Sequence, residues 1–252
     1  MTLVVAHRGA AAVAPENTME AYRLAVELGA DAVELDVHLT VDGELAVIHD
    51  ETLQRTTDRT GLVAGMTMDA IRQADAGAAF APTGGDDRPF AGKGLSVPTL
   101  GEVLTWLPDG IGLVIEIKAR AAADAVVDAV RGHAVRSENR LSVISFDEVA
   151  IERVRALDPE IRTGYLLVPS QPIEPALRWA TEHGHLGVHP WEGDLGIDPL
   201  PILAQAHAYG REVGCYVLND PERMQHLAAC GLWGFVTDRP DVAREALGPR
   251  TG

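Results

Sequence analysis

The chain has 252 residues, of which 46% are hydrophobic and 23% are charged, and its formal net charge is -16. A chain of this length and composition can bury one large core, so we expect a single enzyme-sized domain over residues 1–252. The acidic balance argues against binding to nucleic acid or to an anionic membrane, because both require basic surface. An anionic substrate would need cations concentrated at its own site.

The N-terminal residues MTLVVAHRGA lack a basic segment, and no run approaches the ~18 apolar residues of a membrane span. We therefore expect a soluble, cytoplasmic protein with no stable membrane association. The two cysteines, Cys215 and Cys230, lie in apolar sequence contexts, which favours buried thiols over a disulfide or a zinc site.

Short β-rich apolar runs alternate with longer amphipathic segments, which is the pattern of βα units around a parallel sheet. The expected strands are 3–7, 32–39, 112–118, 141–146, 163–167, 186–189, 214–219 and 234–237. The expected helices are 17–28, 99–107, 121–136, 147–157, 172–183, 199–210, 221–230 and 240–247. Eight strands are the number that closes a (β/α)8 TIM barrel, so we predict that α/β fold.

Signals for a helix start precede three of these helices. They are capping-box spacings at Asn17 with Glu20 and at Thr99 with Glu102, and Asp220 followed by Pro221. The segment from about 52 to 97 breaks the alternation, with a helical stretch near 68–76 followed by the loop-like PTGGDDRPFAGKG. We interpret it as a small insertion after a hairpin on the second strand, and not as a second domain.

That hairpin is predicted from Asp42-Gly43, because alternating runs flank this strong signal for a two-residue turn. With such a turn, two residues are paired when their residue numbers sum to 85. Asp36 therefore lies opposite His49 and on the same face of the hairpin. Glu34 shares that face. The hairpin thus predicts two carboxylates and one imidazole close together.

Other strand ends are also polar, and in a barrel the active site forms at the C-terminal ends of the strands. His7 and Arg8 follow the first strand, and Glu116 and Lys118 end the strand at 112–118.

Three convergent carboxylates, Glu34, Asp36 and Glu116, would repel one another unless a hard divalent cation such as Ca²⁺ or Mg²⁺ bound them. The sequence lacks a cysteine cluster and an HExxH motif, which disfavours zinc.

Each of these residues also has a structural alternative. Glu116 could pair with Lys118, His7 could satisfy backbone groups at a turn, and His49 could be packed in the hairpin. We favour a joint site. Two residues on the same strand face are directed less at each other than at the barrel axis, and both histidines precede a charged residue at a strand end. His189, before Pro190, is a weaker site candidate. We assign no function to the remaining histidines: His38, His133, His183, His185, His207 and His226.

Taken in order, the motifs of this chain resemble those of the glycerophosphodiester phosphodiesterase family. They are AHRGA at 6–10, PENT at 15–18, ELDVHLTVDGELAVIHDETLQRTT at 34–57, VPTLGEVL at 97–104, IEIK at 115–118, SF at 145–146, YVLND at 216–220 and GFVTDRP at 234–240. The resemblance covers nearly the whole chain. It implies a (β/α)8 barrel with a small insertion after the HD motif and hydrolysis of a glycerophosphodiester to an alcohol and glycerol 3-phosphate.

The resemblance also implies roles for the matching residues. Glu34, Asp36 and Glu116 correspond to metal ligands, His7 and His49 to the acid/base pair, and Arg8 and Lys118 to phosphate contacts. The family commonly has tryptophan at the position of Tyr216, within Trp-Thr-Val-Asn where this chain has Tyr-Val-Leu-Asn. An aromatic substrate-binding wall is kept, and the choice of substrate is what the difference affects.

Several alternatives stay open at this point. A lysophospholipase D or a phospholipase-C-like enzyme on the same barrel would need an exposed apolar opening. A metabolite-binding barrel would lack one of the site residues, and none is missing. Salt-bridge networks at the strand ends are the purely structural alternative. The sequence leaves open the alcohol, the metal, which histidine is the acid, whether water or a substrate hydroxyl attacks, and the oligomeric state, including a homodimer.

Overall fold

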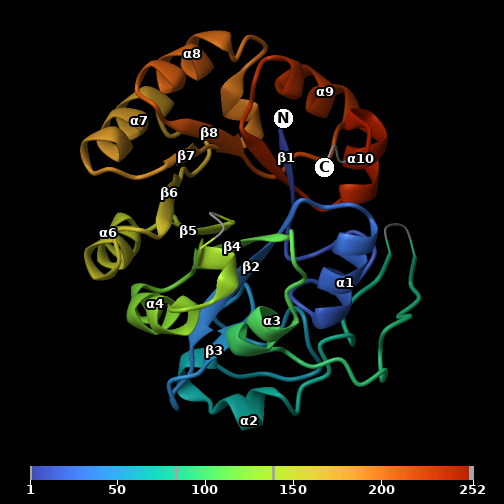
Figure 1. Cartoon of the computed structure of the whole chain (residues 1–252). Helices are drawn as coiled ribbons and strands as arrows, with labels where there is room; N and C mark the ends of the chain where they lie inside the picture. Colours follow the sequence, from blue (N-terminus) through green and yellow to red (C-terminus); the bar gives the residue numbers. More distant parts are fainter. Residues whose placement is uncertain (1, 83–84, 138–139, 250–252) are drawn as a thin grey trace.

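The computed structural model describes residues 2–82, 85–137 and 140–249. Its sheet has the order β1-β9-β8-β7-β6-β5-β4-β2-β3, and β1 also pairs with β2, so eight parallel strands close into a barrel that helices surround (Figure 1). These strands are β1 Leu3–Ala6, β2 Ala32–Leu39, β4 Gly112–Ile117, β5 Leu141–Ser145, β6 Arg162–Leu166, β7 Gly187–His189, β8 Glu212–Cys215 and β9 Gly234–Thr237. The predicted TIM barrel is therefore confirmed.

The helices follow the strands in the predicted order. They are α1 Met19–Glu27, α2 Met68–Ile71, α3 Leu100–Trp106, α4 Ala123–Val130, α5 Ala134–Ser137, α6 Glu148–Leu157, α7 Ile173–Glu182, α8 Leu200–Ala208, α9 Pro221–Ala229 and α10 Pro240–Leu247. Short 3₁₀ turns lie at Val63–Gly65, Arg120–Ala122 and Glu192–Leu195. The helix expected over 121–136 is divided, because Gly132 adopts a φ of 79° between α4 and α5.

Two of the three predicted helix starts are correct, and one is wrong. Thr99 and Glu102 form both hydrogen bonds of a capping box, and Asp220 caps α9 through its side chain. Helix α1, however, is capped by Thr18 and not by Asn17. The side chain of Asn17 instead donates a hydrogen bond to Asp36.

Alternation along β2 separates the core from the site. Val33, Leu35 and Val37 belong to the apolar cluster that joins the barrel to its helices. Glu34 and Asp36 therefore point to the opposite side of the strand, into the barrel. Both are buried, so the strand carries charges into a place where they need partners.

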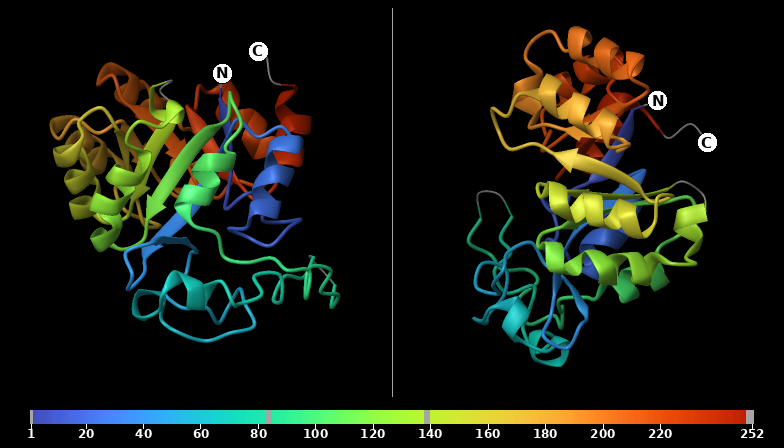
Figure 2. Two further views of the ribbon diagram at one scale, coloured as in Figure 1. Left: turned by 60° about the horizontal axis from the view of Figure 1, so that its bottom comes forward. Right: turned by 90° about the vertical axis from the view of Figure 1, so that its left-hand side faces the viewer.

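The segment between β3, at Leu45–Val47, and α3 lies at the end of the barrel opposite the two chain termini (Figure 2). Its apolar side chains, including Leu53 and Ile71, pack in a cluster that also contains Ala46 and Ile48. The helix expected near 68–76 ends at Ile71. Thr83 and Gly84 of the predicted loop lie outside the described residues, and the division into one domain with an insertion stays a prediction.

The register predicted for the hairpin is wrong by one residue. Val37 pairs with Val47 and Leu39 with Leu45, so paired positions sum to 84. The turn has three residues, because Thr40 accepts a hydrogen bond from Gly43 and its amide donates to Glu44, with Gly43 at a φ of 84°. A glycine in this left-handed conformation is typical of three-residue hairpin loops.

Because of this one-residue difference in register, His49 is not paired with Asp36 in the β-ladder. The amide of Ile48, and not a group of His49, donates to the carbonyl of Asp36, at 3.0 Å. Strand β3 has ended by then, so the position of the His49 ring depends on contacts of its own side chain. Among the described residues, no helix combines the length and the apolar character needed to cross a membrane.

Candidate active site

A pocket of about 170 Å³ opens where the barrel strands end. One part of its wall is charged, and the other part is apolar. The lining residues are His7, Arg8, Glu34, His49, Glu116, Lys118, Ile144, Phe146, Leu166, Tyr216, Val217 and Val236. All the residues predicted to bind substrate or to carry protons thus line one pocket, and Asp36 lies buried beside it.

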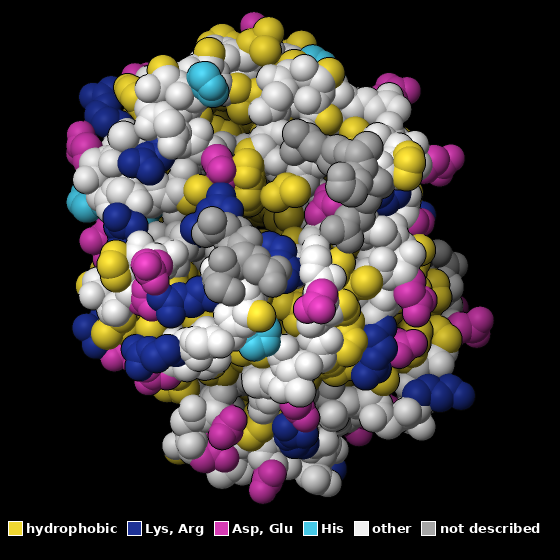
Figure 3. All heavy atoms as spheres, viewed as in Figure 1, with side chains coloured by type: hydrophobic (Ala, Val, Ile, Leu, Met, Phe, Trp, Pro, Cys, Tyr) yellow, Lys and Arg dark blue, Asp and Glu magenta, His cyan; other side chains and the backbone are white. Residues whose placement is uncertain are grey.

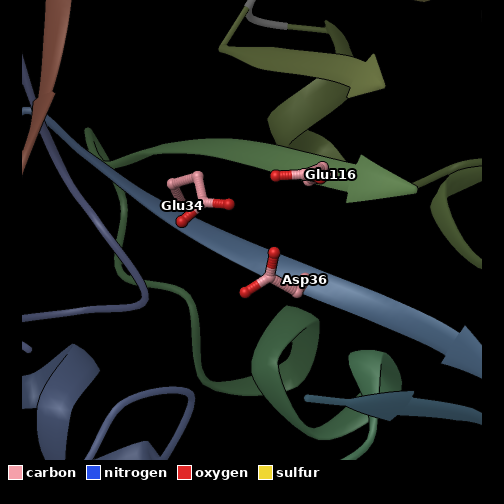
Figure 4. Close-up of side chains that lie close together, drawn as sticks. All are labelled: Glu34, Asp36 and Glu116. Atoms are coloured by element: carbon pink, nitrogen blue, oxygen red, sulfur yellow. The ribbon is translucent and has the colours of Figure 1, made fainter. Parts of the chain in front are cut away.

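Three carboxylates meet at this pocket (Figure 4). Asp36 and Glu116 are register partners on β2 and β4, and an oxygen of each of these two residues and of Glu34 lies within 4.8 Å of the other two. Burial, with the neighbouring carboxylates, raises the pKa of Glu34 and of Glu116. Burial also opposes ionisation of Asp36, but Arg8 and Lys118 outweigh it and lower that pKa.

These residues fit a hard divalent cation. They offer three oxygen donors, and Oδ1 of Asp36 is buried without a hydrogen bond from any residue that the structure describes. Ca²⁺ and Mg²⁺ prefer carboxylate oxygens, and a bound cation would offset the repulsion that raises the pKa of Glu34 and Glu116.

Two cations lie against the carboxylates. Nζ of Lys118 donates to Oε1 of Glu116 at 2.6 Å, so the alternative pairing of these two residues does form, beside the other carboxylates. Lys118 is also 3.6 Å from Asp36, and Nε of Arg8 is 3.2 Å from the other oxygen of Asp36. Burial, which lowers the pKa of Arg8, is outweighed by Asp36, Glu16 and Glu34, so this pKa is raised.

Asn17 holds Asp36 in place. Its amide nitrogen donates to Oδ2 of Asp36 at 2.7 Å, and its carbonyl oxygen accepts from the Tyr22 hydroxyl at 2.8 Å. Asn17 adopts a φ of 55°, which aims its side chain at the site instead of at the helix start. Its spacing to Glu20 predicts a helix cap, and its place in the PENT motif is the sequence signal for a different role.

Each histidine of the pocket is bound by an aspartate. Nδ1 of His7 lies 2.7 Å from Asp238, and Nδ1 of His49 lies 2.7 Å from Asp50. A carboxylate acceptor fixes the proton on Nδ1 of a neutral ring, which leaves Nε2 as the proton-accepting nitrogen. Burial lowers the pKa of His49 against the opposing charges of Asp36 and Asp50.

The sequence interpretation assigned no role to Asp50 or Asp238. Their sequence motifs could have indicated a role at the site, because Asp50 belongs to the HD motif and Asp238 to the TDRP motif. His38, which we set aside, is buried, with Nε2 3.0 Å from the carbonyl oxygen of His49.

Aromatic side chains form the apolar part of the wall. Phe146 and Tyr216 meet edge to face, with ring centroids 5.6 Å apart. The Tyr216 hydroxyl donates to the carbonyl of Leu167, so its ring is what faces the pocket. Burial raises the pKa of Tyr216 to about 12, and the hydroxyl stays protonated at neutral pH.

His189 lies inside the barrel and does not line this pocket. A Cβ atom at Gly164 would come 2.4 Å from its Nε2, and one at Gly214 would come 2.6 Å from its Nδ1. The two glycines therefore make room for the ring. Burial and the nearby Arg162 lower the pKa of His189 to about 4, so the ring is neutral at pH 7.

This histidine is expected to make the protein sensitive to acid. The unfolded state takes up a proton near pH 6.5 and the folded state near pH 4, so stability falls as the pH drops through that window, by roughly 3 kcal/mol. Denaturant unfolding at pH 7 and pH 4 should show a smaller loss for His189→Gln than for the unaltered protein. Equal losses would exclude His189 as the source.

The fold and the site together define an enzyme of the TIM-barrel class, with a carboxylate cluster and two aspartate-bound histidines at the C-terminal ends of the strands. The model of the glycerophosphoryl diester phosphodiesterase family matches residues 7–242. The chain belongs to this family of hydrolases, as its motifs led us to expect.

Similar proteins agree with this assignment. A glycerophosphodiester phosphodiesterase of Caldanaerobacter subterraneus is 35% identical over 96% of each chain. The crystal structure of a glycerophosphodiester phosphodiesterase from Agrobacterium tumefaciens has a TM-score of 0.82 and 32% identity, covering 97% of this chain and 100% of that one. A phosphodiesterase from Oleispira antarctica, solved with the product sn-glycerol-3-phosphate, has a TM-score of 0.84 and 27% identity, covering 98% and 97%.

Proposed function

We propose that this enzyme hydrolyses glycerophosphodiesters to an alcohol and glycerol 3-phosphate, with a divalent cation on Glu34, Asp36 and Glu116. The observation that carries the proposal is the convergence of these three carboxylates beside Arg8 and Lys118. Substrate binding of this kind is supported by the Oleispira antarctica enzyme, which was solved with glycerol 3-phosphate.

Charge explains how an acidic protein would take an anionic substrate. Acidic and basic side chains are interspersed over the face in Figure 3, so the net charge forms no continuous acidic patch there. Once ionised to bind a cation, the three carboxylates together with Arg8 and Lys118 would carry one net negative charge. A divalent cation would reverse this balance, and the site would then attract a phosphodiester.

The bound cation would supply Lewis-acid stabilisation of the charge that develops on the phosphoryl oxygens. Arg8 and Lys118 would hold the phosphate by charge-assisted hydrogen bonds at the same place. Their present partners, Asp36 and Glu116, keep both side chains directed at the pocket.

His7 and His49 would exchange protons with the substrate through Nε2. One histidine would accept the proton of the attacking oxygen, and the other would donate a proton to the departing alcohol. Asp238 and Asp50 would hold the rings and stabilise them when they carry the extra proton. The attacking oxygen is either water or the 2-hydroxyl of the substrate's glycerol, which would form a cyclic phosphate first.

A lysophospholipase D activity is the second candidate, and one observation favours it. Exposed apolar side chains lie near the ends of neighbouring strands on one side of the barrel: Phe146 is 37% exposed, Val168 52% and Trp191 42%. Phe146 also lines the pocket, and an acyl chain would need exposed apolar surface of this kind beside it. A cytoplasmic location and the lack of stable membrane association stay predictions from the sequence.

A substrate panel tests the proposed function. Chelator-treated protein would be assayed against several glycerophosphodiesters and lysophospholipids, with Ca²⁺, Mg²⁺ or Mn²⁺ added back separately. We expect cation-dependent release of the alcohol, with glycerophosphodiesters turned over faster than lysophospholipids. The reverse order would favour the second candidate, and no release from any diester would refute both.

A further inference from the structure

Three charged side chains form a network next to His49. Arg55 donates two hydrogen bonds to Glu16, both at 2.7 Å, and two to Asp50, at 2.8 and 2.9 Å. Glu16 lies in the loop between β1 and α1, whereas Arg55 lies in the segment that follows β3. The guanidinium of Arg55 thus links the loop after β1 to the segment after β3 through side-chain hydrogen bonds.

The network continues into the pocket at both ends. Oδ1 of Asp50 lies 2.7 Å from Nδ1 of His49, and Oε1 of Glu16 accepts a hydrogen bond from Nη1 of Arg8 at 2.8 Å. Arg55 therefore contacts the partner of a proposed acid/base group and the partner of a proposed phosphate contact. It is outside the pocket lining itself.

His49 depends on such contacts because the β-ladder does not reach it. Strand β3 ends at Val47, and the ring of His49 is held by Asp50. His7 is supported differently: its partner Asp238 accepts from Nδ2 of Asn219 at 2.7 Å, in the loop after β8. Arg55 therefore contacts the partner of His49 and not the partner of His7.

A surface ion pair with no role in the reaction is the simpler explanation, since Arg55 is 46% exposed and most exposed ion pairs contribute little to stability or function. The geometry argues against that explanation. Each carboxylate receives two hydrogen bonds from one planar group, which fixes its orientation as well as its charge. Without the guanidinium, Glu16 and Asp50 would lose the cation that they share.

We propose that Arg55 is a positioning residue for the phosphodiesterase reaction. It orients Asp50, so that His49 keeps its proton on Nδ1 and presents Nε2 to the substrate, and it holds Glu16 behind Arg8. This inference rests on the proposed function for its kinetic consequences, but the orientation of His49 is a property of the protein without substrate.

Kinetics provide the first test. Arg55→Ala and Arg55→Lys should each lower kcat about 10- to 100-fold, because lysine lacks the planar donors that bridge both carboxylates. Arg59→Ala, a change of an exposed arginine in the same segment, is the control and should leave kcat unchanged. Guanidinium ion, added well below denaturing concentrations, should restore part of the activity of Arg55→Ala.

Double variants show whether Arg55 acts through Asp50. In an Asp50→Asn background Arg55→Ala should lose the part of its effect that acts through His49 and keep only the part that acts through Glu16 and Arg8, whereas it should retain its full effect in an Asp238→Asn background. Equal effects in both backgrounds, with no rescue by guanidinium, would show a general stabilising role and overturn the proposal.

Nitrogen NMR of labelled histidines tests the orientation without any substrate. In the unaltered protein the Nδ1 of His49 should carry the proton, and Arg55→Ala should shift the signals of His49 while leaving those of His7 in place. Assignment would come from His49→Gln. Unchanged His49 signals would overturn the inference, whereas a shift in a protein that hydrolyses no diester would refute only the proposed function.

Discussion

Replacing His7 or His49 by alanine is expected to lower kcat at least ~100-fold while the protein stays folded. Each ring lines the pocket and is bound at Nδ1 by an aspartate, so each presents its other nitrogen to the substrate. Steady-state kinetics with a glycerophosphodiester measures the loss. Thermal unfolding of both variants checks that the loss is chemical.

The same variants separate the acid from the base. In a diester of p-nitrophenol, the leaving group departs as a stable anion and needs no proton from the enzyme. The variant that lacks the acid should regain most of its relative activity on this ester, and the variant that lacks the base should not. His207→Ala, on the exposed side of α8, is the control. Near-normal activity of either pocket variant on the natural class of substrate would remove that histidine from the mechanism.

Glu34→Gln is expected to abolish cation-dependent turnover and yet to leave the cation-free protein at least as stable. Burial and the neighbouring Asp36 and Glu116 raise the pKa of Glu34, so its charged form is unfavourable in the fold. A neutral amide relieves that repulsion. Without the carboxylate, however, the site loses one of the three oxygen donors for a hard cation.

Unfolding experiments give a measurement independent of activity. A cation present at about 100 times its dissociation constant stabilises a protein by about 2.7 kcal/mol, and we expect this gain for the unaltered protein and a much smaller one for Glu34→Gln. Glu222→Gln, an exposed change in the first turn of α9, should behave like the unaltered protein. Equal stabilisation of all three by Ca²⁺ and by Mg²⁺ would place the cation elsewhere.

Local sequence patterns were sufficient to predict most of the barrel. Strands β2 and β9 have the predicted bounds, because apolar alternation and glycine positions mark a buried strand directly. Strand β8 was predicted at 214–219 but spans Glu212–Cys215. Beyond Cys215 only an isolated bridge between Tyr216 and Trp191 continues the pairing, and Asn219 donates a hydrogen bond to Asp238, a contact that no local sequence pattern predicts.

The hairpin shows where local reasoning fails. Two- and three-residue turns both suit Asp42-Gly43, and the choice between them moves every pair by one position. Thr40 decides it here, because its side chain accepts a hydrogen bond from the amide of Glu44 and donates one to Asp42. The site still forms, because His49 is held by Asp50 and not by a cross-strand neighbour.

The convergence of two histidines and three carboxylates could be predicted from the sequence alone, because strand ends of a barrel meet at one face and charged residues there are costly without a partner. Only the tertiary structure revealed what holds them. His7 meets Asp238, and Arg55 meets Glu16, across long stretches of chain. Such contacts depend on how loops fold over the barrel, and the hydrophobic periodicity that fixes strands and helices carries no information about them.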